Sequence, residues 1–376
     1  MPLGRISARW SDIIGADAAV EALQQAVSLP LRFPELFLVP AAAVGEAPPR
    51  PLDDPRDAGV AVPSFPWRAL LLYGPPGTGK TVLAQATAAE AEATLVSVSA
   101  ADLLSKWVGE SEKCVRRVFS AASRVRGRCV LFLDEIDALC SARGAAGETE
   151  AARRIKTEFL VQMQRLHRAQ HVLLLAATNF PWELDAAFCR RFDQFIYVGL
   201  PDSSARFRIL CRALSAARLG AAVKTLVAAP ARSPSVEATD PTAAREPAGT
   251  SADLAVLTVP VDSVITLAEV RDAAMRLEGY SGSDLVALAK HALIHPVRRL
   301  QRATHFRFEN DAKMYVACSA ANAGSRAMKL LEIPPGYVQP LPLRGQDLFD
   351  AIAFYPRTCT TVEVERYERW NARCAV

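Results

Sequence analysis

The chain has 376 residues, more than one hydrophobic core usually organises, so we expect two domains. The net charge of +4 is small and the charged residues are interspersed, which argues against nucleic acid as a partner. The eight cysteines form no C-x-x-C pair, and no apolar run approaches the roughly 20 residues that cross a bilayer. These features predict a globular cytoplasmic protein without direct membrane insertion.

The N-terminal part combines a helical pattern with a long proline-rich stretch. Apolar residues recur at helical spacing over 18–27, and residues 10–15 before them fit the start of a helix capped by Ser or Asp. Prolines recur throughout 40–66, and such density precludes regular structure. This stretch is predicted to be an exposed loop inserted into the first domain.

A glycine-rich motif follows a buried strand expected at 69–73. It reads Gly-x-x-x-x-Gly-Lys-Thr from Gly74 to Thr81. Glycines let backbone N–H groups curl around phosphate oxygens, which Cβ atoms would obstruct. Lys80 is then placed to reach the β- and γ-phosphates of a nucleotide, and Thr81 a Mg²⁺ ion. An Ala-rich helix expected over 81–93 adds an N-terminus that favours anions, so the motif predicts a phosphate-binding P-loop.

The next unusual stretch is Lys106-Trp107-Val108, which interrupts a helical pattern. It comes after a strand expected at 94–98 and before a helix expected at 112–122. A buried core side chain is the usual interpretation of a Trp such as Trp107. Because Lys and Gly-Glu-Ser flank it, a loop that grips a ligand is an equally good interpretation from the residues alone.

An apolar run at 129–133 predicts another buried strand, and it ends in Asp134-Glu135. In P-loop enzymes an Asp at this place holds Mg²⁺, and the adjacent Glu is placed to polarise the attacking water. An ordinary solvated turn is the alternative interpretation. The P-loop upstream favours the catalytic one.

Two further strands complete the first domain. The strand expected at 172–176 leads to Asn179, whose amide could hydrogen-bond the γ-phosphate or the water. Arg190 and Arg191 precede the strand expected at 195–198. They are either a solvated face or, in a multimeric ATPase, arginine fingers that complete a neighbour's site. Five strands alternating with helices predict a parallel α/β sheet with the nucleotide at its carboxyl edge.

The remaining chain is predicted to be mainly helical. Residues 215–262 are rich in Ala, Pro and Thr and are expected to be a largely disordered insertion. The other expected elements are helices at 204–214, 267–277 and 284 to about 295, a hairpin of 313–318 with 328–333, and a terminal helix at 362–372 that carries Tyr367 and Trp370.

Four motifs in this order resemble those of an AAA ATPase: Gly74 to Thr81, Asp134-Glu135-Ile136-Asp137, Ala177-Thr178-Asn179 and Arg190-Arg191-Phe192. Within that superfamily, residues 148–164 and 279–306 resemble the vacuolar protein sorting-associated ATPases of the meiotic group, which disassemble ESCRT-III polymers. The likeness covers nearly the whole chain except the two proline-rich stretches. It implies an α/β P-loop NTPase domain at 1–202 with a five-stranded parallel sheet, and a smaller, mainly helical domain at 203–376.

The resemblance also implies roles for individual residues. ATP would be bound by Gly74, Pro75, Pro76, Gly77, Thr78, Gly79, Lys80 and Thr81, with Asp12, Ile14, Gly15, Gly282 and Ser283 around the adenine. Thr81 and Asp134 would hold Mg²⁺, Glu135 would activate water, and Asn179 would sense the γ-phosphate. Arg190 and Arg191 would act in trans, in a homo-oligomer such as a hexamer. Lys106, Trp107 and Val108 would form a pore loop gripping an ESCRT-III-type polypeptide, with a second pore loop at 144–150.

The resemblance places an activator at the hairpin and the protein in the cytoplasm, transiently at endosomal membranes through partners. The family's N-terminal microtubule-interacting and trafficking domain has no counterpart here, so recruitment through it is not expected. A basic pair usual after Phe192 is replaced by Gln194-Phe195, so contacts near the arginines are expected to differ. A microtubule-severing AAA protein of the katanin or spastin type is an alternative, and so is a catalytically idle adaptor.

Overall fold

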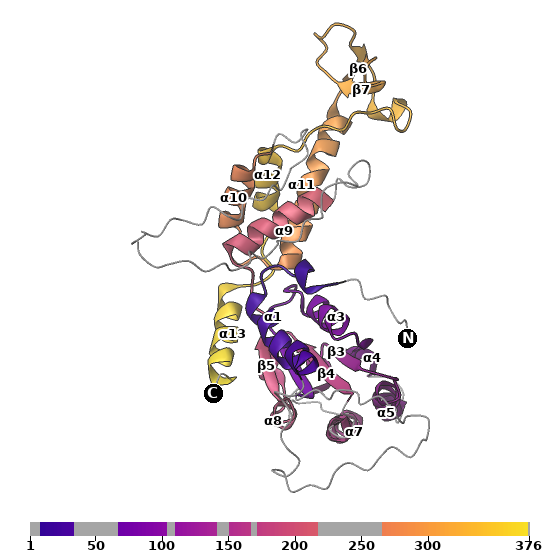
Figure 1. Cartoon of the computed structure of the whole chain (residues 1–376). Helices are drawn as coiled ribbons and strands as arrows, with labels where there is room; N and C mark the ends of the chain where they lie inside the picture. The colour runs from indigo at the N-terminus through magenta and orange to yellow at the C-terminus, as the bar shows by residue number, and fades with distance from the viewer. Residues whose placement is uncertain are drawn as a thin grey trace, which may run out of the picture. The chain divides into compact units, whose positions relative to one another are not determined.

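The computed structural model describes residues 8–33, 67–103, 110–140, 150–166, 171–216 and 265–374, which fall into two compact units (Figure 1). The first, called here the α/β unit, comprises Met1–Ala205, Glu278–Asp284 and Arg357–Val376. The second, called the helical unit, comprises Arg206–Leu277 and Leu285–Pro356. The C-terminal segment and a short stretch around residue 280 therefore belong with the first unit, which a single division after residue 202 does not anticipate.

A five-stranded parallel sheet forms the centre of the α/β unit, as predicted. Its strands have the spatial order β2-β3-β4-β1-β5. They are β1 (Ala69–Tyr73), β2 (Thr94–Ser99), β3 (Cys129–Asp134), β4 (Val172–Thr178) and β5 (Gln194–Tyr197). Every residue of β1 and β4 is buried, which explains their unbroken apolar sequences. Because Tyr73 pairs with Thr178 and Ser99 with Asp134, the ends of β1, β4, β2 and β3 meet at one edge of the sheet.

Two apolar layers cover the sheet, because successive side chains of a strand point to opposite faces. On one face Leu71 and Leu131 pack with Phe119 and Phe159 of two helices. On the other face Leu70 and Phe132 pack with residues of α1 and α3 (Figure 1). The helices of this unit before β5 are α1 (Asp17–Leu23), α2 (Leu29–Arg32), α3 (Lys80–Glu90), α4 (Ala100–Leu103), α5 (Glu110–Ser123), α6 (Asp137–Cys140), α7 (Glu150–Leu166) and α8 (Ala186–Cys189).

The C-terminal helix α13 (Thr361–Cys374) also packs in the α/β unit. The ring of Trp370 lies edge-on to that of Tyr73, with centroids 4.5 Å apart. Tyr367 is only 2% exposed. The aromatic side chains of this helix are therefore part of the unit's core.

Four helices supply most of the helical unit: α9 (Ser203–Ala216), α10 (Leu267–Arg276), α11 (Gly282–Arg302) and α12 (Gly345–Phe354). Helix α11 continues to Arg302 with Pro296 inside it, whereas the sequence pattern predicted an end near residue 295. A proline removes one backbone hydrogen bond but does not end a helix whose other contacts hold it. Helix α12 was not predicted.

A three-stranded antiparallel sheet follows α11, in the order β7-β6-β8. Its strands are β6 (His305–Glu309), β7 (Met314–Ala317) and β8 (Arg326–Ala327). The predicted hairpin of 313–318 with 328–333 is wrong, because β6 pairs with both other strands and Leu330–Glu332 is a 3₁₀ turn. Phe306, fully buried with Leu300 and Ile333, fixes β6 in the centre.

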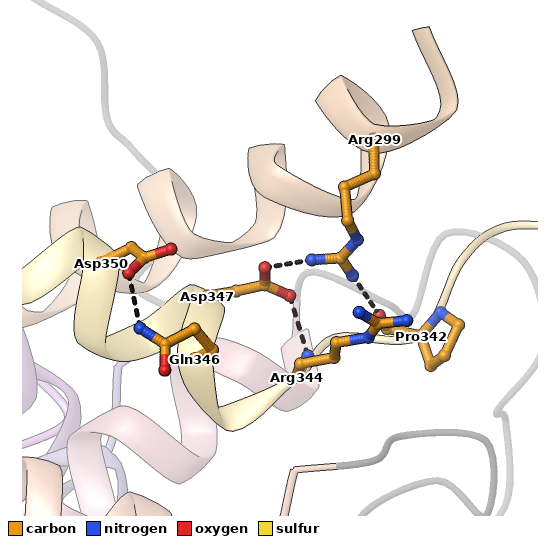
Figure 2. Close-up of polar contacts among 6 residues, drawn as sticks. All are labelled: Arg299, Pro342, Arg344, Gln346, Asp347 and Asp350. Carbon is orange, nitrogen blue, oxygen red and sulfur yellow. Dashed lines mark hydrogen bonds and ion pairs between the residues drawn. The ribbon is translucent and has the colours of Figure 1, made fainter. Parts of the chain in front are cut away.

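A charged network joins the end of α11 to the start of α12 (Figure 2). Arg299 forms an ion pair with Asp347 and donates a hydrogen bond of 2.8 Å to the carbonyl oxygen of Pro342. The second carboxylate oxygen of Asp347 accepts from the backbone N–H of Arg344 at 2.8 Å. Asp347 is 3% exposed, so its charge depends on these partners.

Several predicted segments lie outside the described residues. They are the pore-loop residues Lys106, Trp107 and Val108, residues 144–149 of the second pore loop, the stretch 40–66 and most of 215–262. Among the helices that the structure describes, none is long and apolar enough to cross a membrane.

Candidate nucleotide site

Lys80 begins α3 directly after the glycine-rich loop and folds back over it. Its Nζ donates hydrogen bonds of 2.8 Å to the carbonyl oxygens of Gly74 and Pro75. The side chain is buried, and burial lowers the pKa of Lys80 to about 8, against the opposing effect of the carboxylates of Asp134 and Asp137. A buried cation at a helix N-terminus is suited to a phosphate group.

Gly77 brings the glycine-rich loop into contact with the stretch around residue 282. Its φ is +75°, and an added Cβ would lie 2.0 Å from Oγ of Ser283. The backbone N–H of Ser283 donates to the carbonyl oxygen of Gly77 at 3.1 Å. The predicted contact residues Gly77 and Ser283 therefore lie together, and only glycine fits between them.

Asp284 extends this contact toward the C-terminal segment. Its buried carboxylate accepts from the backbone N–H of Ser281 at 3.0 Å and from the hydroxyl of Thr358 at 2.5 Å. Sequence reasoning did not assign this role to Asp284 or Thr358. The residues are 74 positions apart, so no local pattern joins them.

Thr81 and Asp134 meet across the edge of the sheet. Oγ1 of Thr81 donates a hydrogen bond of 2.9 Å to Oδ2 of Asp134, although one residue lies on α3 and the other ends β3. Hydroxyl and carboxylate oxygens are the hard ligands that Mg²⁺ takes, usually one or two from the protein beside phosphate oxygens. The two residues therefore fit the predicted metal.

Glu135 follows Asp134 in a left-handed backbone conformation. Its φ is +54°, which is uncommon for a residue with a Cβ, and its backbone N–H donates to Oδ1 of Asp134 at 3.0 Å. Its side chain is exposed. Strained conformations of this kind persist where the surroundings fix them, and they often occur at active sites.

Asn179 lies just beyond the end of β4, at the same edge of the sheet. The preceding Thr178 donates a 2.6 Å hydrogen bond to Asp137 and accepts one of 3.0 Å from the N–H of Phe180. The carbonyl oxygen of Asn179 accepts a 2.5 Å hydrogen bond from the hydroxyl of Tyr367. Its backbone is thus held from both sides.

Arg190 and Arg191 lie away from these residues. They follow α8, and nearby Asp193 accepts hydrogen bonds from the N–H groups of Arg68 and Ala69 at the start of β1. The glycine-rich loop follows the other end of β1. A strand of this length spans about 15 Å, so the arginines and Lys80 occupy opposite edges of the sheet.

The predicted adenine-side residues Asp12, Ile14 and Gly15 lie in and after the 3₁₀ turn Trp10–Asp12. Asp12 accepts a 3.0 Å hydrogen bond from the backbone N–H of Arg9. An added Cβ on Gly15 would lie 2.5 Å from Cβ of Ala205, so this segment passes close to the start of α9.

Comparisons with known proteins agree with this site. Residues 70–200 match the ATPase family associated with various cellular activities (AAA), and residues 315–374 match the Vps4 C terminal oligomerisation domain. The chain is 35% identical over 368 residues to protein SUPPRESSOR OF K(+) TRANSPORT GROWTH DEFECT 1 of Arabidopsis thaliana, covering 96% of this chain and 69% of the relative. It is 34% identical to vacuolar protein sorting-associated protein 4 of Dictyostelium discoideum, covering 96% and 68%. The chain belongs to the Vps4 group of AAA ATPases.

Other relatives of this Vps4-group chain set limits on what can be transferred to it. It is 36% identical over 341 residues to human vacuolar protein sorting-associated protein 4A, covering 87% of this chain but 62% of that protein. It is 37% identical over 295 residues to a katanin p60 ATPase-containing protein of Xenopus tropicalis, the A-like 2 form, which spans 78% of this chain and 43% of the relative. Among solved structures, the FIGL-1 AAA domain in complex with ADP matches with a TM-score of 0.63 and 27% identity, covering 97% of this chain and 90% of that one.

Proposed function

We propose that the protein is a Mg²⁺-dependent ATPase that acts as a homo-oligomer, a hexamer, to disassemble ESCRT-III-type polypeptide assemblies in endosomal sorting. The observation that carries the proposal is the meeting of Lys80, Thr81 and Asp134 at one edge of the sheet, with Glu135 beside them. A nucleotide-binding scaffold without turnover would not need the last of these. The protein would work in the cytoplasm and reach endosomal membranes through partners.

Each residue has a chemical task in this proposal. The ammonium group of Lys80 would turn from the carbonyl oxygens of Gly74 and Pro75 toward the β- and γ-phosphates. Thr81 and Asp134 would hold Mg²⁺, which when bound neutralises charge on those phosphates. The exposed carboxylate of Glu135 would accept a proton from the attacking water. The side-chain amide of Asn179 would orient the γ-phosphate or that water.

Arg190 and Arg191 would act on the neighbouring protomer. They lie about 15 Å from the glycine-rich loop of their own chain, which is beyond the reach of an arginine side chain. Positive charge from a neighbour is worth roughly 10³ to 10⁵ in rate at such a site. The match of residues 315–374 to an oligomerisation domain supports an assembly in which this happens.

The mechanical part of the proposal rests on the family. Lys106, Trp107 and Val108 would grip an extended polypeptide in a central pore, and 144–150 would form a second pore loop. An activator would dock on the sheet of β6, β7 and β8. Hydrolysis would move the pore loops from one grip to the next.

Microtubule severing is the second candidate, favoured by the identity to a katanin protein. The test compares the full chain and its Glu135→Gln variant on preassembled ESCRT-III filaments and on microtubules, with ATP turnover measured in the same samples. We expect ATP-dependent loss of filaments, intact microtubules and no activity of the variant. Severed microtubules with unaffected filaments would favour the second candidate, and the lack of any turnover would favour an idle adaptor.

A further inference from the structure

Helix α13 contacts the segment that immediately follows the end of β4. Trp182, in the 3₁₀ turn Pro181–Glu183, lies with its ring centroid 4.9 Å from that of Tyr367. The guanidinium carbon of Arg366 lies 3.9 Å from the Trp182 centroid, in a cation–π contact. Two consecutive residues of α13 thus hold the segment that begins at Asn179.

The contact of Tyr367 with Asn179 itself is a hydrogen bond of 2.5 Å from the phenol to the backbone carbonyl oxygen. The Tyr367 ring is 2% exposed, and burial raises the pKa of its hydroxyl above the ordinary value, which keeps it a neutral donor. The residues are 188 positions apart. A carbonyl at the end of a strand has no ladder partner of its own, so this donor fixes the peptide that carries the Asn179 side chain.

The same helix also contacts the strand that leads into the glycine-rich loop. Tyr73, the last residue of β1, donates a 2.5 Å hydrogen bond from its hydroxyl to Oδ1 of Asn371. Its ring packs edge-on against Trp370. One face of α13 therefore bridges the ends of β1 and β4, between which the phosphates would lie.

We propose that Tyr367 is a positioning residue that holds Asn179 in the orientation needed to sense the γ-phosphate, and so couples the C-terminal helix to ATP turnover. The proposal rests on the role given above to Asn179. It requires nothing of the bound ADP state, because ADP has no γ-phosphate for the amide to meet. Loss of the hydroxyl should therefore lower kcat, and leave the KM for ATP and the affinity for ADP nearly unchanged.

The experiment compares Tyr367→Phe with Tyr197→Phe in the full chain. Both tyrosines belong to one aromatic cluster, with ring centroids 6.3 Å apart, and both changes remove one hydroxyl without emptying the core. We expect Tyr367→Phe to lower kcat roughly 3- to 10-fold, the effect of one neutral hydrogen bond, and Tyr197→Phe to keep the original value. Sedimentation in ATP, in a Glu135→Gln background, should show the same assembly for both.

A double-mutant cycle with Asn179→Ala separates this inference from the proposed function. If both stand, Asn179→Ala lowers turnover strongly and Tyr367→Phe adds nothing to it. If Asn179→Ala lowers turnover and Tyr367→Phe either has no effect or adds its full effect to it, the positioning role is wrong while the sensor role stands. If Asn179→Ala leaves turnover intact, the sensor role is wrong and the positioning role with it. A Tyr367→Phe variant with weaker ADP binding and a smaller assembly would show a structural role instead.

Discussion

The hydroxyl of Thr81 donates to the carboxylate of Asp134 at 2.9 Å, across 53 positions of the chain. This pair joins the glycine-rich loop to the strand that carries Glu135. It places two hard oxygen atoms side by side, at the point where α3 and β3 would both reach the phosphates in the proposed mechanism. The pair therefore makes the metal dependence of nucleotide binding a direct test of the site.

Thr81→Val should remove most of the gain in ATP affinity that Mg²⁺ provides. The change deletes the hydroxyl and keeps the side-chain volume, and we expect about a 10-fold weaker affinity in Mg²⁺ with little change in EDTA. Titration of a fluorescent ATP analogue in both solutions measures this. The matched control is Thr87→Val on the same helix, where the hydroxyl only donates to the carbonyl oxygen of Leu83. An equal effect of both changes would contradict the assignment.

ATP binding should take up protons above pH 8. The pKa of Lys80 in the free protein is about 8, below the ordinary lysine value, so at pH 8.5 roughly three quarters of the molecules carry a neutral Lys80. Phosphate beside the amine raises its pKa again, so binding protonates it, and affinity falls as the pH rises through this range. Calorimetry in two buffers of different ionisation enthalpy should detect the uptake at pH 8.5 and almost none at pH 7. Equal heats in both buffers at pH 8.5 would speak against it.

Gly77→Ala should abolish ATP binding, because the added Cβ would collide with Ser283 and the backbone has a left-handed φ. Gly127→Ala is the control. Its φ is +85°, but nothing lies within 4 Å of the added Cβ, so it adds backbone strain alone. We expect a loss of about 1–2 kcal/mol of stability and normal ATP affinity for the control. Normal affinity of Gly77→Ala would show that the contact with Ser283 is not part of the site.

Asp347→Ala should destabilise the protein by about 3–5 kcal/mol, because it leaves the charge of Arg299 without its partner in a mostly buried place. The side chains of this pair are 28% and 4% exposed. Asp272→Ala breaks the pair of Asp272 with Arg276, whose side chains are 41% and 61% exposed, and should cost only about 0.3–0.5 kcal/mol. Urea unfolding of the full chain measures both. Similar midpoints for the two variants would refute a special role of the Arg299–Asp347 pair.

The parallel sheet could be predicted because its signals are local. Fully buried strands such as β1 and β4 read as unbroken apolar runs, and the motifs at Gly74 and Asp134 mark two strand ends directly. The sheet of β6, β7 and β8 could not be assembled in the same way. Its central strand, His305–Glu309, alternates apolar and polar side chains, but its partners are set by the burial of Phe306 rather than by turn residues.

Helix α12 and the contacts of α13 show two different limits. The start of α12 carried a readable signal, since Arg344 and Asp347 have the spacing of a reciprocal N-terminal cap. The contact of Tyr367 with Asn179 carried none. The helix and its aromatic residues are visible in the sequence, but which carbonyl a hydroxyl reaches 188 positions away depends on packing alone.

The central claim, a site shared between protomers, is tested most directly by mixing two inactive variants. An Arg190→Ala/Arg191→Ala chain keeps Glu135, and a Glu135→Gln chain keeps both arginines. In a closed head-to-tail ring of randomly mixed protomers, about a quarter of the sites would combine an intact Glu135 with a neighbour's arginines. The account predicts that each variant alone is inactive and that an equal mixture regains ATP turnover. A mixture as inactive as its two components, or full turnover by the arginine variant alone, would contradict it.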